Sequence, residues 1–213
     1  MNAGYVSLWI MTIALILIAT GWSDYVGVSL NRTKLTIVTI VCVILHFFQM
    51  KFSVGHIDIN LHAGVVVAMA AALMAMRGPL LWDSKYYLLT CALLTGMIWG
   101  SIRKMYMIDP VFFWFDPRWD APLLGGLLAA AFSTKATHQF TVLLFSAAFS
   151  EIMCSLLQGG LYVANIGSLA WWDGFWVSYV CARMISVLFN LLRICGERFI
   201  ALSWRKKGGS TPE

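Results

Sequence analysis

A glutamate and an arginine lie inside stretches of sequence that are otherwise apolar enough to sit in hydrocarbon. Glu151 stands in "FSEIMCSLL" and Arg183 stands in "YVCARMISV". A charge in a membrane helix is costly, so it is expected to be paired, neutral, or turned toward water or a site. At 1.5 Å of rise per residue, both charges lie about 10 Å below the same interface if Gln158 and Trp176 end their helices. The sequence therefore predicts a Glu151 and Arg183 ion pair between two consecutive helices.

Further polar residues follow each of these charges at the three- and four-residue spacing of one helix face. Two more end the second predicted helix on the same side of the membrane. These candidates for a polar cavity in the outer half are His46, Gln49, Ser155, Gln158, Ser186 and Asn190. Two interpretations stay open. Either the predicted pair only joins two helices, or it lines a cavity that orders a substrate headgroup, an ion or a proton.

The stretch "GHIDINLH" alternates imidazole and carboxylate side chains, which are metal ligands. Its weak metal candidates are His56, Asp58 and His62. If the stretch is extended, they share one face. No HExxH spacing and no paired Cys and His spacing accompanies them, so a polar cap at the membrane interface is the competing interpretation. No cofactor is expected.

The composition indicates the class of protein in which these residues lie. The chain has 213 residues, of which 60% are hydrophobic and 12% are charged, and its mean hydropathy is +0.78. Soluble domains carry roughly 25% charged residues. The N-terminal apolar run has no preceding Lys or Arg, so it is expected to be a retained helix and not a signal peptide. We expect one integral membrane domain over residues 1–213, with no soluble domain and no nucleic-acid role.

Continuous apolar runs predict an all-α, polytopic bundle of about seven membrane-spanning helices. The predicted helices cover residues 4–22, 35–50, 61–77, 86–102, 121–133, 138–158 and 176–195. The fifth is short for a crossing, so whether it crosses fully stays open. The spacing of Gly96 and Gly100 permits close approach of another helix, in this chain or in a second copy.

The distribution of positive charge predicts the orientation. With seven spans and the N-terminus outside, ten Lys and Arg residues fall on the inner side and four on the outer side. Cytoplasmic loops carry the excess of Lys and Arg. We therefore expect residues 196–213 to form a basic cytoplasmic tail beside anionic headgroups.

The hydropathic plan resembles one known family. The segment "IGSLAWWDGFWVSYVCARMISVLFNL" has a Trp-rich turn that leads into an arginine-bearing last helix. In this it is similar to the YphA-type membrane proteins of spore-forming Gram-positive bacteria. The resemblance implies a small multi-pass protein of the bacterial plasma membrane. It brings no catalytic residues to carry over.

Two classes of function follow from these features. The first is a non-enzymatic accessory, scaffold or transporter-like protein whose outer-half cavity is lined by His46, Glu151 and Arg183. The alternative is a membrane-embedded enzyme acting on a lipid or isoprenoid substrate through the His and Asp residues of the outer side. The expected partners are membrane lipids and other membrane proteins or a second copy of the chain.

Overall fold

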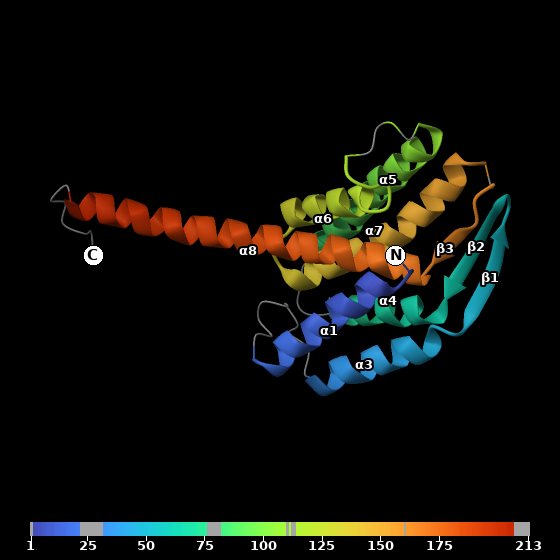
Figure 1. The fold of residues 1–213 in the computed structure, drawn as a ribbon, viewed down its shortest axis with the longest axis horizontal. Helices are drawn as coiled ribbons and strands as arrows, with labels where there is room; N and C mark the ends of the chain where they lie inside the picture. The colour runs from blue at the N-terminus through green and yellow to red at the C-terminus, as the bar shows by residue number, and fades with distance from the viewer. Residues whose placement is uncertain are drawn as a thin grey trace.

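The structure is a computed structural model, and it describes residues 2–21, 32–75, 82–109, 111, 114–159 and 161–206. In these residues seven helices form a bundle that carries a small sheet at one end (Figure 1). The helices are α1 (Tyr5–Ala19), α3 (Arg32–Leu45), α4 (Ala63–Ala75), α5 (Trp82–Ile108), α6 (Asp120–Phe132), α7 (Ala136–Leu157) and α8 (Leu169–Lys206). Each predicted apolar segment overlaps one of them.

The helices alternate in direction along the bundle. The starts of α1, α4, α6 and α8 and the ends of α3, α5 and α7 lie at the end that carries the sheet (Figure 1). Among the residues that the structure describes, two helices are long and apolar enough to cross a membrane by length and composition alone, Ala136–Leu157 and Leu169–Arg198. The apolar stretches in α1, α4 and α6 are shorter.

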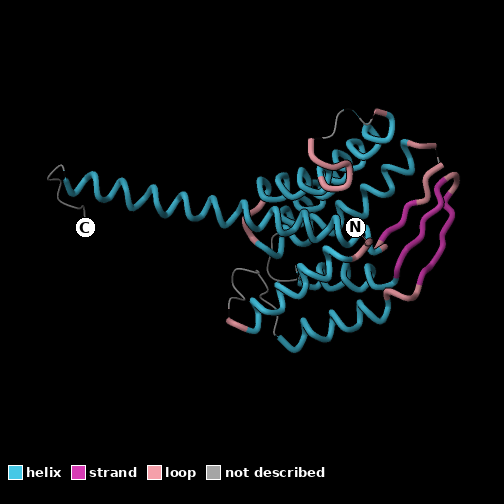
Figure 2. The backbone as a smooth tube through the Cα atoms, in the orientation of Figure 1, coloured by secondary structure: helices cyan, strands magenta, loops and turns pink. Residues whose placement is uncertain are grey.

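A three-stranded sheet departs from the all-α prediction. Its strands are β1 (Gln49–Val54), β2 (Ile57–His62) and β3 (Ala164–Ile166), in the order β1-β2-β3 (Figure 2). β1 and β2 pair antiparallel, and β2 and β3 pair parallel. The sequences "QMKFSV" and "IDINLH" alternate apolar and polar residues, which is the period of a strand. Between them Gly55 takes a φ of +64°, which suits the tight two-residue turn.

Helix α8 differs from its predicted bounds at both ends. It begins at Leu169 and not at residue 176, because the Ser168 hydroxyl accepts a hydrogen bond from the Trp171 amide (3.2 Å) and caps the first turn. It continues to Lys206, so most of the predicted tail is helical, while residues 207–213 lie outside the described residues. The Trp171 side chain is buried and packs in the hydrophobic core.

Small residues let the central helices approach closely. A Cβ atom on Gly96 would lie 2.6 Å from the Phe149 Cβ atom, and one on Gly100 would lie 2.9 Å from the Ser150 carbonyl oxygen. The predicted glycine face of α5 therefore contacts α7 of the same chain. Likewise a Cβ atom on Gly126 of α6 would lie 2.4 Å from the carbonyl oxygen of Ser178 in α8. These contacts fix the register of the helices at the sheet end.

Candidate functional site

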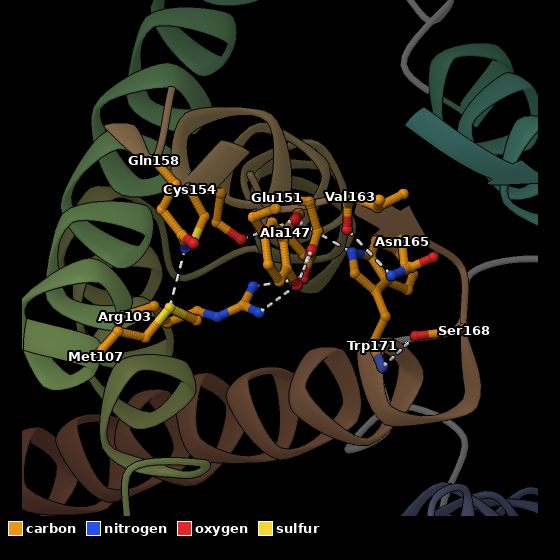
Figure 3. A network of polar contacts seen from close by, with 12 residues as sticks. Arg103, Met107, Ala147, Glu151, Cys154, Gln158, Val163, Asn165, Ser168 and Trp171 are labelled. Atoms are coloured by element: carbon orange, nitrogen blue, oxygen red, sulfur yellow. Dashed lines mark hydrogen bonds and ion pairs between the residues drawn. The ribbon is translucent and has the colours of Figure 1, made fainter. Parts of the chain in front are cut away.

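Glu151 is paired, but with a different arginine from the one that the sequence predicted. Arg103 of α5 donates from Nη1 to Glu151 Oε1 as an ion pair and from Nη2 to the Tyr162 hydroxyl (3.0 Å). The Tyr162 hydroxyl in turn donates to Glu151 Oε2 (2.8 Å). Figure 3 shows the guanidinium of Arg103 extended toward Glu151 across the gap between the two helices. The three groups form a closed polar triangle.

The helix register explains why Arg103 reaches Glu151. Gly96 and Gly100 face α7, and Arg103 follows Gly100 by three residues on the same face of α5. α5 and α7 run side by side in the same direction, since Gly96 meets Ser146 and Gly100 meets Ser150. Arg103 is thereby carried to the level of Glu151.

A cavity of about 620 Å³ opens beside this triangle. Arg103 and Glu151 both line it, with side chains that are 24% and 6% exposed. Residues of α1, α5, α6, α7, α8 and the connections between them contribute the rest. The lining includes Asn2, Ala3, Val6, Trp99, Arg103, Tyr106, Met107, Arg118, Trp119, Pro122, Ser150, Glu151, Tyr162, Asn165, Ser168, Ala170, Trp171, Asp173 and Gly174. The volume lies in the range of small-molecule sites, and the lining mixes aromatic rings with a few charges, as such sites do.

Tyr162 lies in the connection between α7 and α8, and it acts as a neutral donor. Burial, and after it the negative charge of Glu151, raises the pKa of its phenol to about 12, although the nearby Arg103 acts to lower it. The hydroxyl therefore keeps its proton at physiological pH. Ser155 holds this connection in place, because its hydroxyl donates to the Tyr162 carbonyl oxygen (2.6 Å).

Two further carboxylates near the cavity serve as anchors for backbone. Asp173 of α8 accepts hydrogen bonds from the amides of Gly4 and Ser7 (both 2.7 Å) and from the Ser7 hydroxyl (2.6 Å). Asp120 accepts from the amides of Trp114 (2.6 Å) and Phe115 (3.2 Å). Asp173 thus holds the first turn of α1, and Asp120 holds the connection that leads into α6. An anion is well placed at such free amides.

The predicted pair of Glu151 and Arg183 is wrong. Because α8 begins at Leu169, Arg183 lies fourteen residues into the helix, which is about 21 Å from its start. It donates to the carbonyl oxygen of Thr134 (3.2 Å) and to Gln139 Oε1 (3.3 Å), at the opposite end of α7. The error came from treating Trp176 as the start of the helix.

The other cavity candidates lie outside the lining. Gln139 Nε2 donates to the Ser186 hydroxyl (2.7 Å), so Ser186 belongs with Arg183 in a second polar cluster. Gln158 ends α7 and contacts Met107 Sδ (2.9 Å), and Asn190 is exposed on α8.

His46 and Gln49 lie beside the sheet. The His46 ring stacks on the His62 ring at 4.7 Å between centroids, and His62 Nδ1 donates to the His46 carbonyl oxygen (2.9 Å). Gln49 is exposed at the start of β1, opposite His62. Of the predicted cavity set and the predicted pair, only Glu151 lines the cavity.

The three metal candidates are spread along the hairpin. His56 lies in the turn, and Asp58 and His62 lie in β2, where they are exposed and buried respectively. At about 3.3 Å of rise per residue, His56 and His62 are roughly 20 Å apart along the chain. They cannot share one ion. Within the described residues, no three His, Cys, Asp or Glu side chains gather at one point.

Comparisons with known proteins place the chain in one group. A family model described as YphA-like integral membrane protein matches residues 3–209. No curated protein and no solved structure matches the chain. The match covers nearly the whole chain, including every element that lines the cavity.

Proposed function

The chain belongs to the YphA-like integral membrane protein family, and from this premise we propose that it is a small non-enzymatic membrane protein whose cavity binds a small polar ligand. The observation that carries the proposal is the Arg103, Glu151 and Tyr162 triangle on the cavity wall. A charge pair inside a membrane helix bundle marks a functional site by default. Binding of this kind suits a transporter-like protein or a ligand-responsive accessory subunit.

The triangle is suited to binding because it is neutral as a whole and yet offers free hydrogen-bonding capacity. Arg103 uses one donor on each terminal nitrogen, and a guanidinium has five N–H groups in a fixed plane. The quarter of its side chain that remains exposed adjoins the cavity. A ligand oxygen can therefore take a further donor from Arg103 without breaking its contact with Glu151.

We further propose seven crossings in the bacterial plasma membrane, with the sheet end outside and the end of α8 in the cytoplasm. The alternating directions of the helices support an odd number of crossings. Lys51, Arg103, Lys104 and Arg118 are the cations toward the sheet end, and in this arrangement the other eleven of the fifteen Lys and Arg residues belong to the opposite side, where cations favour the cytoplasm. A reporter that is active only in the cytoplasm should work after the C-terminus and fail before the N-terminus. The reverse result would overturn the orientation.

The enzymatic alternative gains no particular support from the acidic residues of this end. Asp109 Oδ1 accepts from the Val111 amide (3.1 Å), and Asp116 Oδ1 accepts from the Arg118 amide (2.8 Å). Both carboxylates therefore cap their own turns. Asp120 is occupied by the amides that precede α6.

A test of ligand binding should fill the cavity without touching the triangle. Ala170 lines the cavity and is exposed in the first turn of α8, so Ala170→Trp should occupy the space and leave the packing intact. Ala19, exposed at the far end of α1, provides the control substitution Ala19→Trp. Native mass spectrometry of protein extracted with its surrounding lipid should show a bound small molecule in the parent and in the control. The adduct should be lost in Ala170→Trp, and equal adducts in all three proteins would refute the cavity as the site.

A further inference from the structure

One wall of the cavity is formed by the first turn of α1 and by the residues that lead into it. Asn2, Ala3 and Val6 of the α1 end line the cavity. In the first two turns of α1, the side chains of Tyr5, Leu8 and Trp9 are 52%, 64% and 52% exposed. In a membrane, such exposed apolar side chains contact lipid. The first turn of α1 therefore separates the cavity from the hydrocarbon of the bilayer.

Helix α1 is attached to the bundle mainly through α8. Among the residues of α1 whose burial the structure describes, Ser7 is the buried one. Its amide and hydroxyl are two of the three donors to Asp173, and the Gly4 amide is the third. The polar attachment of this wall to α8 is therefore made through one carboxylate.

The lining favours an amphiphile with an anionic head. Arg103 and Arg118 place two guanidinium groups on it, whereas Glu151 and Asp173 already accept hydrogen bonds from the protein. Guanidinium groups match phosphate and carboxylate oxygens in geometry. The apolar part of the wall includes Trp99, Met107, Pro122 and Trp171, and the lining also has the polar residues Asn2, Ser150, Asn165 and Ser168.

We propose that the ligand is a membrane lipid with a phosphate head, which enters the cavity sideways past the first turn of α1, and that Asp173 is the latch that holds this wall closed. This inference rests on the proposed function, because it assumes that the cavity binds a ligand. Beyond the proposed function, it specifies the class of ligand and the route by which the ligand enters the cavity. A lipid already in the bilayer needs only the displacement of one turn of α1, while a soluble phosphate ester would enter from water.

The experiment uses the full chain in lipid nanodiscs that contain phosphatidylglycerol with a photoactivatable diazirine in its acyl chain. Illumination should attach the lipid to peptides that contain Trp99 or Trp171. The variant Asp173→Asn keeps the shape of the latch and removes its charge, and it should raise the initial rate of attachment about tenfold. Ser7→Ala, which removes one of the three donors, should raise it by a smaller factor. Asp58→Asn is the matched control, because this exposed carboxylate lies in β2 and is absent from the lining, and its rate should equal that of the parent.

The outcomes separate the lipid route from ligand binding itself. Attachment in the cavity at one rate in the parent, Asp173→Asn and Ser7→Ala would overturn the latch and with it the proposed route. If glycerol 3-phosphate in water raises the melting temperature and the lipid does not label the cavity, the ligand comes from water, and the proposed function survives without this inference. If neither probe binds, both proposals fail.

Discussion

Removal of Arg103 is the perturbation whose effect follows most directly from the structure. The substitution Arg103→Met keeps most of the apolar stem and deletes the guanidinium. Glu151 then keeps the Tyr162 hydroxyl as its partner, with a side chain that is 6% exposed. Removing one partner of a buried ion pair leaves the other charge uncompensated and costs about 3 to 5 kcal/mol of stability. We expect Arg103→Met to lower the free energy of unfolding by an amount in this range.

The complementary substitution should cost less. In Glu151→Gln the arginine that remains is 24% exposed and retains the Tyr162 hydroxyl as an acceptor. We therefore expect a loss of about 1 to 3 kcal/mol, as for a hydrogen bond to a charged group. The double variant Arg103→Met with Glu151→Gln leaves no unpaired charge. Its loss should be smaller than that of Arg103→Met alone.

Unfolding in mixed micelles with increasing denaturing detergent, followed by circular dichroism, measures these differences. Arg183 supplies the control pair, since its contacts lie at Thr134 and Gln139. The effects of Arg183→Met and Glu151→Gln should add to within about 0.5 kcal/mol, as for distant sites. A stable Arg103→Met variant, or additive effects of Arg103→Met and Glu151→Gln, would refute the reasoning.

Three further predictions concern the pH dependence of stability, the packing of two glycines, and metal binding at His62. Burial, and then the nearness of His62, lowers the pKa of His46 from its ordinary 6.5, so the unfolded chain binds the proton more readily. Stability should hold above pH 6.5 and fall as the pH drops below it, and His46→Gln should flatten this dependence in thermal melts between pH 7 and pH 5. Gly126→Ala should destabilise because its Cβ atom would meet the Ser178 carbonyl oxygen at 2.4 Å, whereas Gly196→Ala has open space and should stabilise by about 0.5 to 1 kcal/mol. Thermal melts that rank the two glycine variants in the opposite order would contradict the α6 and α8 contact. His62 should remain stacked on His46, so purified parent protein with a divalent metal bound at His62 would contradict this pair.

The helices could be predicted from the sequence, because the continuous apolar runs identify them one by one. The hairpin was missed because residues 49–50 and 61–62 were assigned to two predicted helices and residues 51–60 to the connection between them. Its signal was present in the alternation around Gly55 and in the two-residue turn. The short strand β3 has three residues, and its pairing with β2 spans more than a hundred positions of sequence. No local pattern carries that information.

The site was half predicted. Glu151 was identified because a charged side chain is costly inside a membrane. Its partner, however, was inferred from the predicted ends of the helices. The predicted start of α8 was seven residues too late, and this placed Arg183 at the same depth as Glu151. The better signal was the glycine face of α5, since Gly96, Gly100 and Arg103 share it. Tyr162 and Asp173 carried no comparable signal. Their roles depend on where the connections fold, which spacing along the chain does not reveal.

An experimental density map of the protein, extracted with its native lipid, tests the central claim most directly. We predict continuous density for a ligand in the cavity, with a polar end within hydrogen-bond distance of Arg103 and with the Arg103, Glu151 and Tyr162 contacts retained. A map in which side chains fill this space, or in which Arg103 points away from Glu151, would contradict the account.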